Sequence, residues 1–370
     1  MTLLLILLLI GALMLLPPRL LRRYGYRRLT YTLAFSEEEV SEGDTVQLIE
    51  TICSEKLLPL PWVKAELTTD AALEFAQGQS AVSDGARFVS SFFSLHPYRR
   101  IERRWQVKCT RRGIFTVSHA VLVLSDLFGT AELSQAYPEA EAMIRVLPAV
   151  SPVDLQTAVP PGFSGEYIIN RSLIPDRFAV CGIRPYTDGD ALRDICWSAT
   201  ARSETPMVWQ YQETAAPSMS VLLDLTSRPT DRDRVSDHAV YEQSIKVCAS
   251  YLYAAASARI PVRLLANTEI GGAPAETAPG TGTAAATELL RLLAALPDTI
   301  SGRFTDLLRA ILQRDPAAAI LVITPLPDAE LLKMAAAVPR MTVLSVRRLS
   351  AELVRENVRQ AMPEPERRTS

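Results

Sequence analysis

Oxygen-bearing side chains that follow one apolar segment could hold a divalent metal ion. Directly after the apolar run "SMSVLL" come Asp224 and Thr226, and Arg228 stands two residues further on. Carboxylate and hydroxyl oxygens are the hard ligands that Mg²⁺ prefers in proteins. A guanidinium next to a dication is electrostatically unfavourable, however. We therefore predict a degenerate site, in which Asp224 and Thr226 are present but no metal is bound.

This spacing resembles the metal site of von Willebrand factor A domains, which place D-x-S-x-S at the end of such a strand. Asp224 and Thr226 match the first two positions, whereas Arg228 takes the third. Those domains supply another aspartate from a later strand end, where this sequence reads "VITPLPD", with Thr324 and Pro325 at that place. Two oxygen ligands are therefore missing.

The sequence offers little to a catalytic centre. Only three histidines occur, and neither a G-x-S-x-G motif nor a Walker loop is present. The segment "PGTGTAAATELL" has the glycine spacing of a dinucleotide fingerprint, but a loop rather than a strand precedes it. The five cysteines are scattered and form no C-x-x-C pair. We expect no enzymatic activity and no cofactor.

The densest polar and aromatic run lies in residues 184–213. Within it, the positions of a short amphipathic helical stripe are occupied by Leu192, Ile195, Cys196 and Ala199. Asp190, after Gly189, is a suitable amino-terminal cap for this helix, and Arg202 suits its carboxyl end. Arg193 and Trp197 are four residues apart, close enough on a helix for a guanidinium to contact an indole.

The segment "MVWQYQ" that follows alternates like a half-buried strand. Two interpretations of the whole run remain open. It is either a scaffold that fixes the entrance to a domain through caps and ion pairs, or a surface that holds another protein.

Length and composition limit the class of protein around these residues. A chain of 370 residues is long enough for about two domains, and 48% hydrophobic residues support sizeable cores. The 39 basic and 41 acidic residues nearly cancel, so we expect no nucleic-acid partner.

The amino terminus departs from this pattern. "MTLLLILLLIGALMLL" is apolar throughout and is followed by five arginines up to Arg28. Because these charges come after the apolar run, the sequence predicts a membrane anchor over residues 1–28, with the bulk of the chain on the cytoplasmic side of the cell membrane. A cleaved signal peptide would need a positively charged side chain before the run and small residues at its end, and both are missing here.

The remaining chain predicts two domains of different class. Residues 29–150 contain six or seven short β-rich segments separated by turns, which favours a β-sandwich domain. Its six arginines between positions 99 and 112 indicate either a solvated strand face or a surface for an acidic partner. Residues 151–352 alternate strands with helices, which predicts a doubly wound α/β domain. Residues 353–370 form a polar tail.

Taken together, the run at 184–213 resembles the signature of the domain of unknown function 58 family. The family pattern R-x-Y-x-x-G-D-x-x-R-x-I-x-W-x-x-[AS]-A-R is matched by Arg184, Tyr186, Gly189, Asp190, Arg193, Ile195, Trp197, Ala201 and Arg202. Ser198 stands where a lysine is usual, and one apolar segment replaces the usual two-helix hairpin. The resemblance implies a membrane-anchored β-sandwich followed by a von Willebrand A-like domain.

The resemblance also implies a function. Such proteins are thought to act with MoxR-type AAA+ ATPases as adaptors or assembly factors. We therefore expect a non-enzymatic, membrane-anchored interaction protein that contacts the AAA+ ATPase through Arg184, Tyr186, Gly189, Asp190, Arg193, Trp197 and Arg202. The alternative is a metal-dependent adhesion-type domain that binds a ligand through Asp224. A hydrolase is a third hypothesis, without a nucleophile–base pair to support it.

Overall fold

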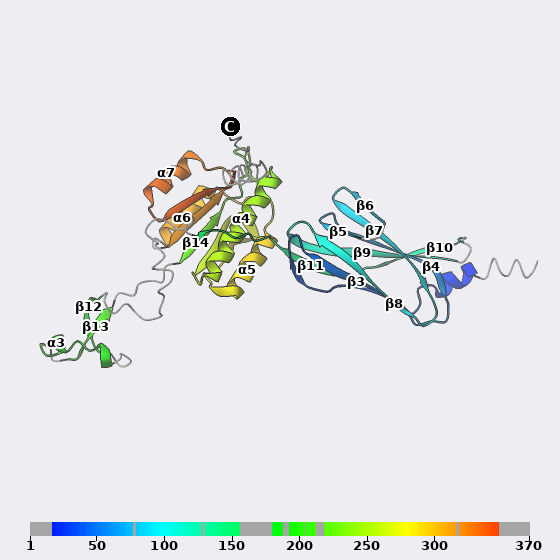
Figure 1. Ribbon diagram of the computed structural model, residues 1–370, viewed down its shortest axis with the longest axis horizontal. Helices are drawn as coiled ribbons and strands as arrows, with labels where there is room; N and C mark the ends of the chain where they lie inside the picture. Colours follow the sequence, from blue (N-terminus) through cyan, green and yellow to red (C-terminus); the bar gives the residue numbers. More distant parts are fainter. Residues whose placement is uncertain are drawn as a thin grey trace, which may run out of the picture. The chain divides into compact units, whose positions relative to one another are not determined.

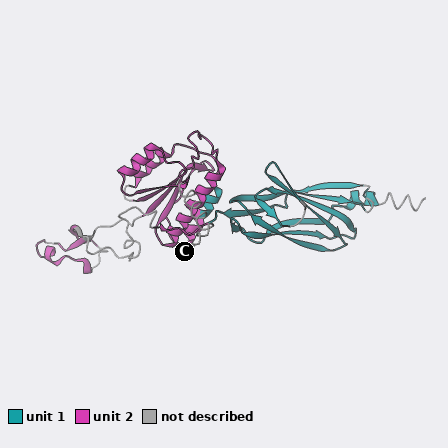
Figure 2. Ribbon diagram, turned by 45° about the horizontal axis from the view of Figure 1, so that its top comes forward, with its two compact units in different colours: residues 1–149, 290–296 teal, residues 150–289, 297–370 magenta. Residues whose placement is uncertain are grey.

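The computed structural model describes residues 17–76, 79–126, 129, 131–155, 180–187, 192–203, 205–211, 218–315 and 318–347. The chain divides into two compact units, which are coloured separately in Figure 2. The first consists of Met1–Ala149 with Leu290–Leu296, and the second of Val150–Leu289 with Pro297–Ser370.

The first unit is a β-sandwich (Figure 1). One sheet has four strands in the order β1 (Leu29–Phe35), β3 (Thr45–Ser54), β8 (Arg100–Cys109) and β5 (Leu73–Phe75). The other sheet has seven strands. Six follow the order β2 (Glu39–Ser41), β11 (Ala142–Leu147), β9 (Gly113–Ser125), β4 (Leu60–Asp70), β7 (Ala86–Leu95) and β6 (Gln79–Ser83), and β10 (Glu132–Tyr137) pairs with β9.

Side-chain alternation explains why these segments pack as two sheets. In β3 every second residue is buried, since successive side chains of a strand point to opposite faces. The inward residues of both sheets form one hydrophobic cluster, which includes Leu48, Ile52, Leu122 and Ile144. The fold of this unit therefore follows from a pattern with a period of two residues.

A fully buried carboxylate, Glu50, lies within this sandwich. Its oxygens accept hydrogen bonds from Tyr31 Oη at 2.8 Å and Trp105 Nε1 at 2.9 Å. Ser91 of β7 donates to it from the opposite sheet at 3.3 Å. A buried carboxylate is tolerated when donors replace its water in this way.

The second unit contains a five-stranded sheet in the order β16 (Ala273–Glu276), β15 (Val262–Ile270), β14 (Met219–Leu223), β17 (Ala319–Thr324) and β18 (Met341–Ser345). The strands run parallel except for β16. Every residue of β14 and β17 is buried, as is usual for parallel strands that are covered on both faces.

In the described chain between residues 238 and 337 there are four helices: α4 (His238–Ser257), α5 (Gly282–Ala295), α6 (Phe304–Arg314) and α7 (Ala329–Ala337). The end of α5, from Leu290, is grouped with the first unit. Phe304 and Leu308 of α6 and Leu331 of α7 share a buried cluster with Leu222 and Val322 of the sheet. Asp237 and Asp328 cap α4 and α7, because their side chains accept hydrogen bonds from backbone N–H groups of the first turn.

A small two-stranded module lies within residues 180–211. It consists of β12 (Val180–Pro185), a 3₁₀ turn (Leu192–Asp194), α3 (Trp197–Thr200) and β13 (Met207–Tyr211). We call it the motif module, because the run of polar and aromatic residues that begins at Arg184 lies in it. Strands β12 and β13 pair antiparallel.

The fold class that the sequence led us to expect needs correction. The described part of the chain is mostly β-sandwich with some helices, and the amino-terminal membrane anchor is not supported. Within that part, no helix has both the length and the apolar character needed to cross a membrane. Residues 17–24 form a short helix whose Leu21 packs into the sandwich core. The apolar residues 1–16 lie outside the described residues, and the location at the cell membrane stays a prediction.

Candidate functional site

The carboxyl edge of the parallel sheet is the first candidate site. Strand β14 lies between β15 and β17 in the sheet. After β14 the chain continues to β15 on one side, and after β17 it continues to β18 on the other side. Ligands of open α/β sheets bind in the crevice that opens at such a point. Asp224 follows β14 directly and Thr324 ends β17, and the Thr324 hydroxyl donates to Asp224 Oδ2 at 2.9 Å. The two positions singled out in the sequence therefore meet.

The Asp224 carboxylate is buried and hydrogen-bonded to the protein. Its Oδ1 accepts the Thr226 backbone N–H at 3.0 Å and the Asn267 amide at 3.3 Å. Burial raises the pKa of Asp224, although hydrogen bonds from Thr226 and Thr324 oppose the shift. Protein donors thus contact both oxygens that could bind a metal.

In the segments that the structure describes, no three His, Cys, Asp or Glu residues come close enough together to hold a metal ion. Asp224 and Thr226 are adjacent, as the sequence pattern requires, and Thr324 joins them. The expectation that no metal binds here stays a prediction.

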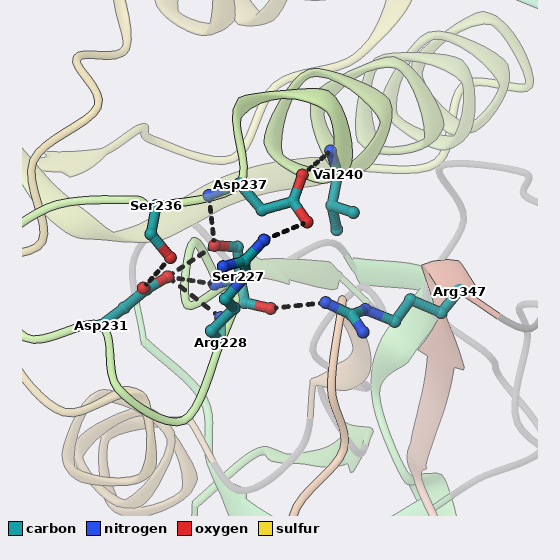
Figure 3. A network of polar contacts seen from close by, with 7 residues as sticks. All are labelled: Ser227, Arg228, Asp231, Ser236, Asp237, Val240 and Arg347. Atoms are coloured by element: carbon teal, nitrogen blue, oxygen red, sulfur yellow. Dashed lines mark hydrogen bonds and ion pairs between the residues drawn. The ribbon is translucent and has the colours of Figure 1, made fainter.

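Arg228, at the third position of the pattern, is directed toward the amino terminus of α4 (Figure 3). Its Nη2 lies 3.5 Å from Asp237 Oδ2, and its side chain is 55% exposed. Arg347, beyond β18, donates to the Ser227 carbonyl at 3.0 Å. Both guanidinium groups therefore contact the loop between β14 and α4.

That loop is held by Asp231, which the sequence analysis did not single out. Its Oδ2 accepts a hydrogen bond from the Ser227 hydroxyl at 2.5 Å and hydrogen bonds from the Ser227 and Arg228 backbone N–H groups at 3.0 Å each. Its Oδ1 accepts a hydrogen bond from the Ser236 hydroxyl (Figure 3). Partial burial alone raises the pKa of Asp231, but the hydrogen bonds from Ser227, Ser236 and the backbone outweigh it and lower the pKa to about 2. The carboxylate thus fixes the loop at neutral pH.

Two polar residues at this edge could have been found from the sequence. Asn267 ends the apolar stretch "VRLLA", so its side chain falls at the same sheet edge as Asp224. Asp231 follows Ser227 by four residues in "SRPTD", a spacing at which a side chain bonds backbone groups of its own loop. Both signals become recognisable once the parallel sheet is known.

The motif module is the second candidate site. In its strand register Ile183 lies opposite Trp209, and Arg184 lies opposite Val208. Val208 is buried, whereas Ile183 and Trp209 are exposed. The Tyr186 backbone N–H donates to the Pro206 carbonyl at 2.8 Å, which continues the ladder beyond β12.

The amphipathic helix predicted from the stripe at Leu192–Ala199 is wrong. Ile195 instead forms a β-bridge with Val208, and the Cys196 N–H donates to the Met207 carbonyl at 2.7 Å. Pairing with β13 divides the segment, so that a 3₁₀ turn at Leu192–Asp194 and the short helix α3 stand in place of one continuous helix. The i, i+4 relation on one helix that was expected for Arg193 and Trp197 is therefore absent. Gly189 and Asp190, with its predicted cap, lie outside the described residues.

Of the remaining charged and aromatic signature residues, one makes hydrogen bonds within the module and three are exposed to solvent. The Arg184 guanidinium donates to the Pro185 carbonyl and the Thr187 hydroxyl, both at 3.2 Å. By contrast, Arg193 and Arg202 are exposed, and Trp197 is 72% exposed. Among the described signature residues, one tryptophan and two arginines are thus exposed to solvent.

Arginines of the first unit contact aromatic and acidic side chains of the same unit. Arg103 lies 4.1 Å from the centroid of the Phe93 ring and 5.4 Å from that of Trp105. Arg104 pairs with Glu102 at 2.9 Å, and Arg111 pairs with Asp70 at 3.2 Å. These contacts favour a solvated strand face over a surface for an acidic partner.

A family model supports the assignment that the signature indicated. Residues 182–352 match the family described as "Protein of unknown function DUF58". The matched region contains the motif module from Gly182 onward and the whole parallel sheet. No curated protein matches the chain.

Solved structures show only distant similarity. A non-cellulosomal cohesin from Archaeoglobus fulgidus is 14% identical, covers 32% of this chain and 91% of its own, and has a TM-score of 0.24. The CARDB domain of a Pyrococcus furiosus protein, solved with di-metal ions, is 11% identical over 33% of this chain and 96% of its own, with a TM-score of 0.23. TM-scores of this size carry no functional information.

Proposed function

We propose that this protein is a non-enzymatic interaction and assembly protein, and that the motif module contacts a MoxR-type AAA+ ATPase. One observation carries the proposal: Trp197, Arg193 and Arg202 are exposed around a module whose own core uses Cys196 and Val208. An exposed tryptophan contributes little to folding. At an interface, tryptophan and arginine are the residue types that most often dominate the binding energy.

The AAA+ ATPase as partner follows from the family resemblance. In the described residues the oxygens of Asp224 and Asp231 are engaged by protein donors. These hydrogen bonds hold the sheet edge and the loop after β14 in place, which agrees with a binding role.

The proposal predicts that binding can be lost without loss of folding. Arg193→Ala, Arg202→Ala and Trp197→Ala should each weaken co-purification with a co-expressed MoxR-type ATPase by about tenfold or more, since an anchor residue is worth about 2 kcal/mol. Their melting temperatures should stay close to that of the wild type, because exposed side chains contribute roughly 0–1 kcal/mol to stability.

Arg309→Ala is the matched control, since Arg309 is 54% exposed and lies on α6, outside the motif module. It should leave co-purification unchanged. Retention of the ATPase by all three motif variants would refute the contact surface. Unfolding of those variants would instead show that the residues are structural.

A second candidate function is a metal-dependent adhesion-type domain. The observation that favours it is the gathering of Asp224, Thr226 and Thr324 at one crevice of the sheet. A metal that binds only the folded protein, at 100 times its dissociation constant, stabilises it by about 2.7 kcal/mol.

We predict that Mg²⁺ and Mn²⁺ leave the melting temperature unchanged, because protein donors contact the Asp224 oxygens and Arg228 replaces a ligand. Thermal unfolding with increasing metal tests this. A stabilisation of the size given above that disappears in Asp224→Asn, with Asp231→Asn as the control, would favour the adhesion-type function.

A further inference from the structure

Three large aromatic side chains are exposed on the outer face of one sheet of the sandwich. Trp62 of β4 is 56% exposed, and Phe88 and Phe92 of β7 are 48% and 51% exposed. Strands β4 and β7 are neighbours in the sheet (Figure 1). Clustered apolar groups on the surface of a protein mark an interaction site more often than single exposed residues do.

The same face carries an ion pair among the aromatic side chains. Lys64 Nζ lies 2.6 Å from Glu66 Oε1, and the two side chains are 38% and 45% exposed. In the strand register Lys64 is opposite Phe92, and Thr68 is opposite Phe88. Trp62, Lys64, Phe92 and Val123 also border a hollow of about 410 Å³.

The charged residues of β4 can pair with those of a second, antiparallel copy of the same strand. Consider two copies packed face to face and related by a two-fold axis that lies in the interface, perpendicular to β4, and passes midway between Lys64 and Glu66. The β4 strands of the two copies are then antiparallel. Lys64 of one copy faces Glu66 of the other, and Trp62 faces the row that carries Thr68 and Phe88. An axis along the strand would instead stack Lys64 on Lys64, which is unfavourable. A two-fold interface requires complementarity of this kind.

We propose that this face, formed by the outward residues of β4 and β7 with Val123 of β9, is a self-association surface that binds a second copy of the chain with antiparallel β4 strands. The face of four neighbouring strands (β9, β4, β7 and β6) covers roughly 600 Å². A specific interface buries about 800 Å² on each partner, so the dimer is weak and forms with rising concentration.

Charge reversal tests the proposed geometry. Sedimentation equilibrium of the full chain should show a monomer–dimer equilibrium for the wild type. Lys64→Glu and Glu66→Lys should each weaken dimerisation by tenfold or more, because each places four like charges at the centre of the interface. The chain with both substitutions, and an equimolar mixture of the two single variants, should dimerise within about threefold of the wild type.

The rescue distinguishes pairing between copies from a change in folding, because a misfolded variant would not be restored by mixing. Lys108→Glu makes the same change of charge at an exposed position of β8, in the other sheet, and should leave dimerisation unchanged. A wild type that is monomeric at about 100 μM would overturn the proposal. So would single variants that dimerise normally, or a mixture that does not recover.

Discussion

Glu50 shows how a single residue couples the stability of the sandwich to pH. Burial raises the pKa of its carboxyl, and hydrogen bonds from Tyr31 and Trp105, together with the charge of Arg103, oppose part of the shift. A carboxyl whose pKa is raised by folding favours the folded state below its unfolded pKa of about 4.3. That contribution is lost as the pH rises through the folded pKa, so the donors around Glu50 matter most when it is ionised.

Tyr31→Phe tests this coupling. Loss of the hydroxyl should lower the free energy of unfolding by about 1 kcal/mol. The loss should be larger at pH 8 than at pH 4, because the hydrogen bond from Tyr31 favours the ionised carboxyl. Urea unfolding at the two pH values measures it, and Tyr98→Phe, at a 65% exposed position, is the control. Equal losses at both pH values would show that the hydroxyl does not stabilise the charge.

The contribution of Asp231 to stability depends on pH in the opposite direction to that of Glu50. Its folded pKa of about 2 lies below the value for an unfolded aspartate. Its contribution to the stability of the second unit is therefore present above about pH 3.9 and lost as the pH falls through about 2. The donors that cause the shift are the Ser227 and Ser236 hydroxyls and the backbone of the loop.

At the scale of elements, the sequence predicts best where burial alone produces the pattern. Among the β-rich segments predicted in residues 29–150 is β7, and among the helices predicted in residues 151–352 is α4, because each buries one face on a core. Short strands such as β2 and β10 have no such pattern and depend on partners that are distant in sequence.

The candidate sites were predictable in part for the same reason. Asp224 and Thr324 follow buried strands, so the sheet edge brings them together. The helix expected at Leu192–Ala199 failed because a backbone bridge from Ile195 to Val208 overrides helix propensity in a short segment. Asp231 acts through loop geometry that no periodicity encodes.

The motif module depends on one threonine that joins its two halves. The Thr200 hydroxyl donates to the Cys196 carbonyl and accepts the Met207 N–H, both at 2.9 Å. Thr200→Val keeps the shape of the side chain but removes both bonds. We expect about 1–2 kcal/mol of local destabilisation, measured as faster amide hydrogen exchange in residues 195–211 and as weaker co-purification with the proposed ATPase partner.

Thr205→Val is the control for that variant, because Thr205 is exposed in the turn before β13. It should change neither exchange nor binding. If Thr200→Val exchanges like the wild type, the two bonds do not hold the module together.

At the scale of the whole molecule, the described residues include one hydrophobic cluster in the sandwich and another beneath α6 and α7. The sandwich cluster draws its residues from Leu21 to Val146, and the cluster under α6 and α7 draws its residues from Leu222 to Met341. Glu50 and Asp231 therefore report on different units and with opposite dependence on pH. Substitutions at the two positions should act independently, because they share no partner in the described parts of the chain.

We predict that Asp231→Asn lowers the stability of the second unit by about 1–2 kcal/mol at pH 7 and by little near pH 2, because only the ionised carboxylate gains from its four donors. In the double variant with Tyr31→Phe, the two losses should add within about 0.5 kcal/mol. Hydrogen exchange resolved by peptide should show the effect of Tyr31→Phe in the sandwich and that of Asp231→Asn in the loop between β14 and α4. A clear departure from additivity, or an effect of either substitution on the other unit, would show that the two cores are energetically coupled.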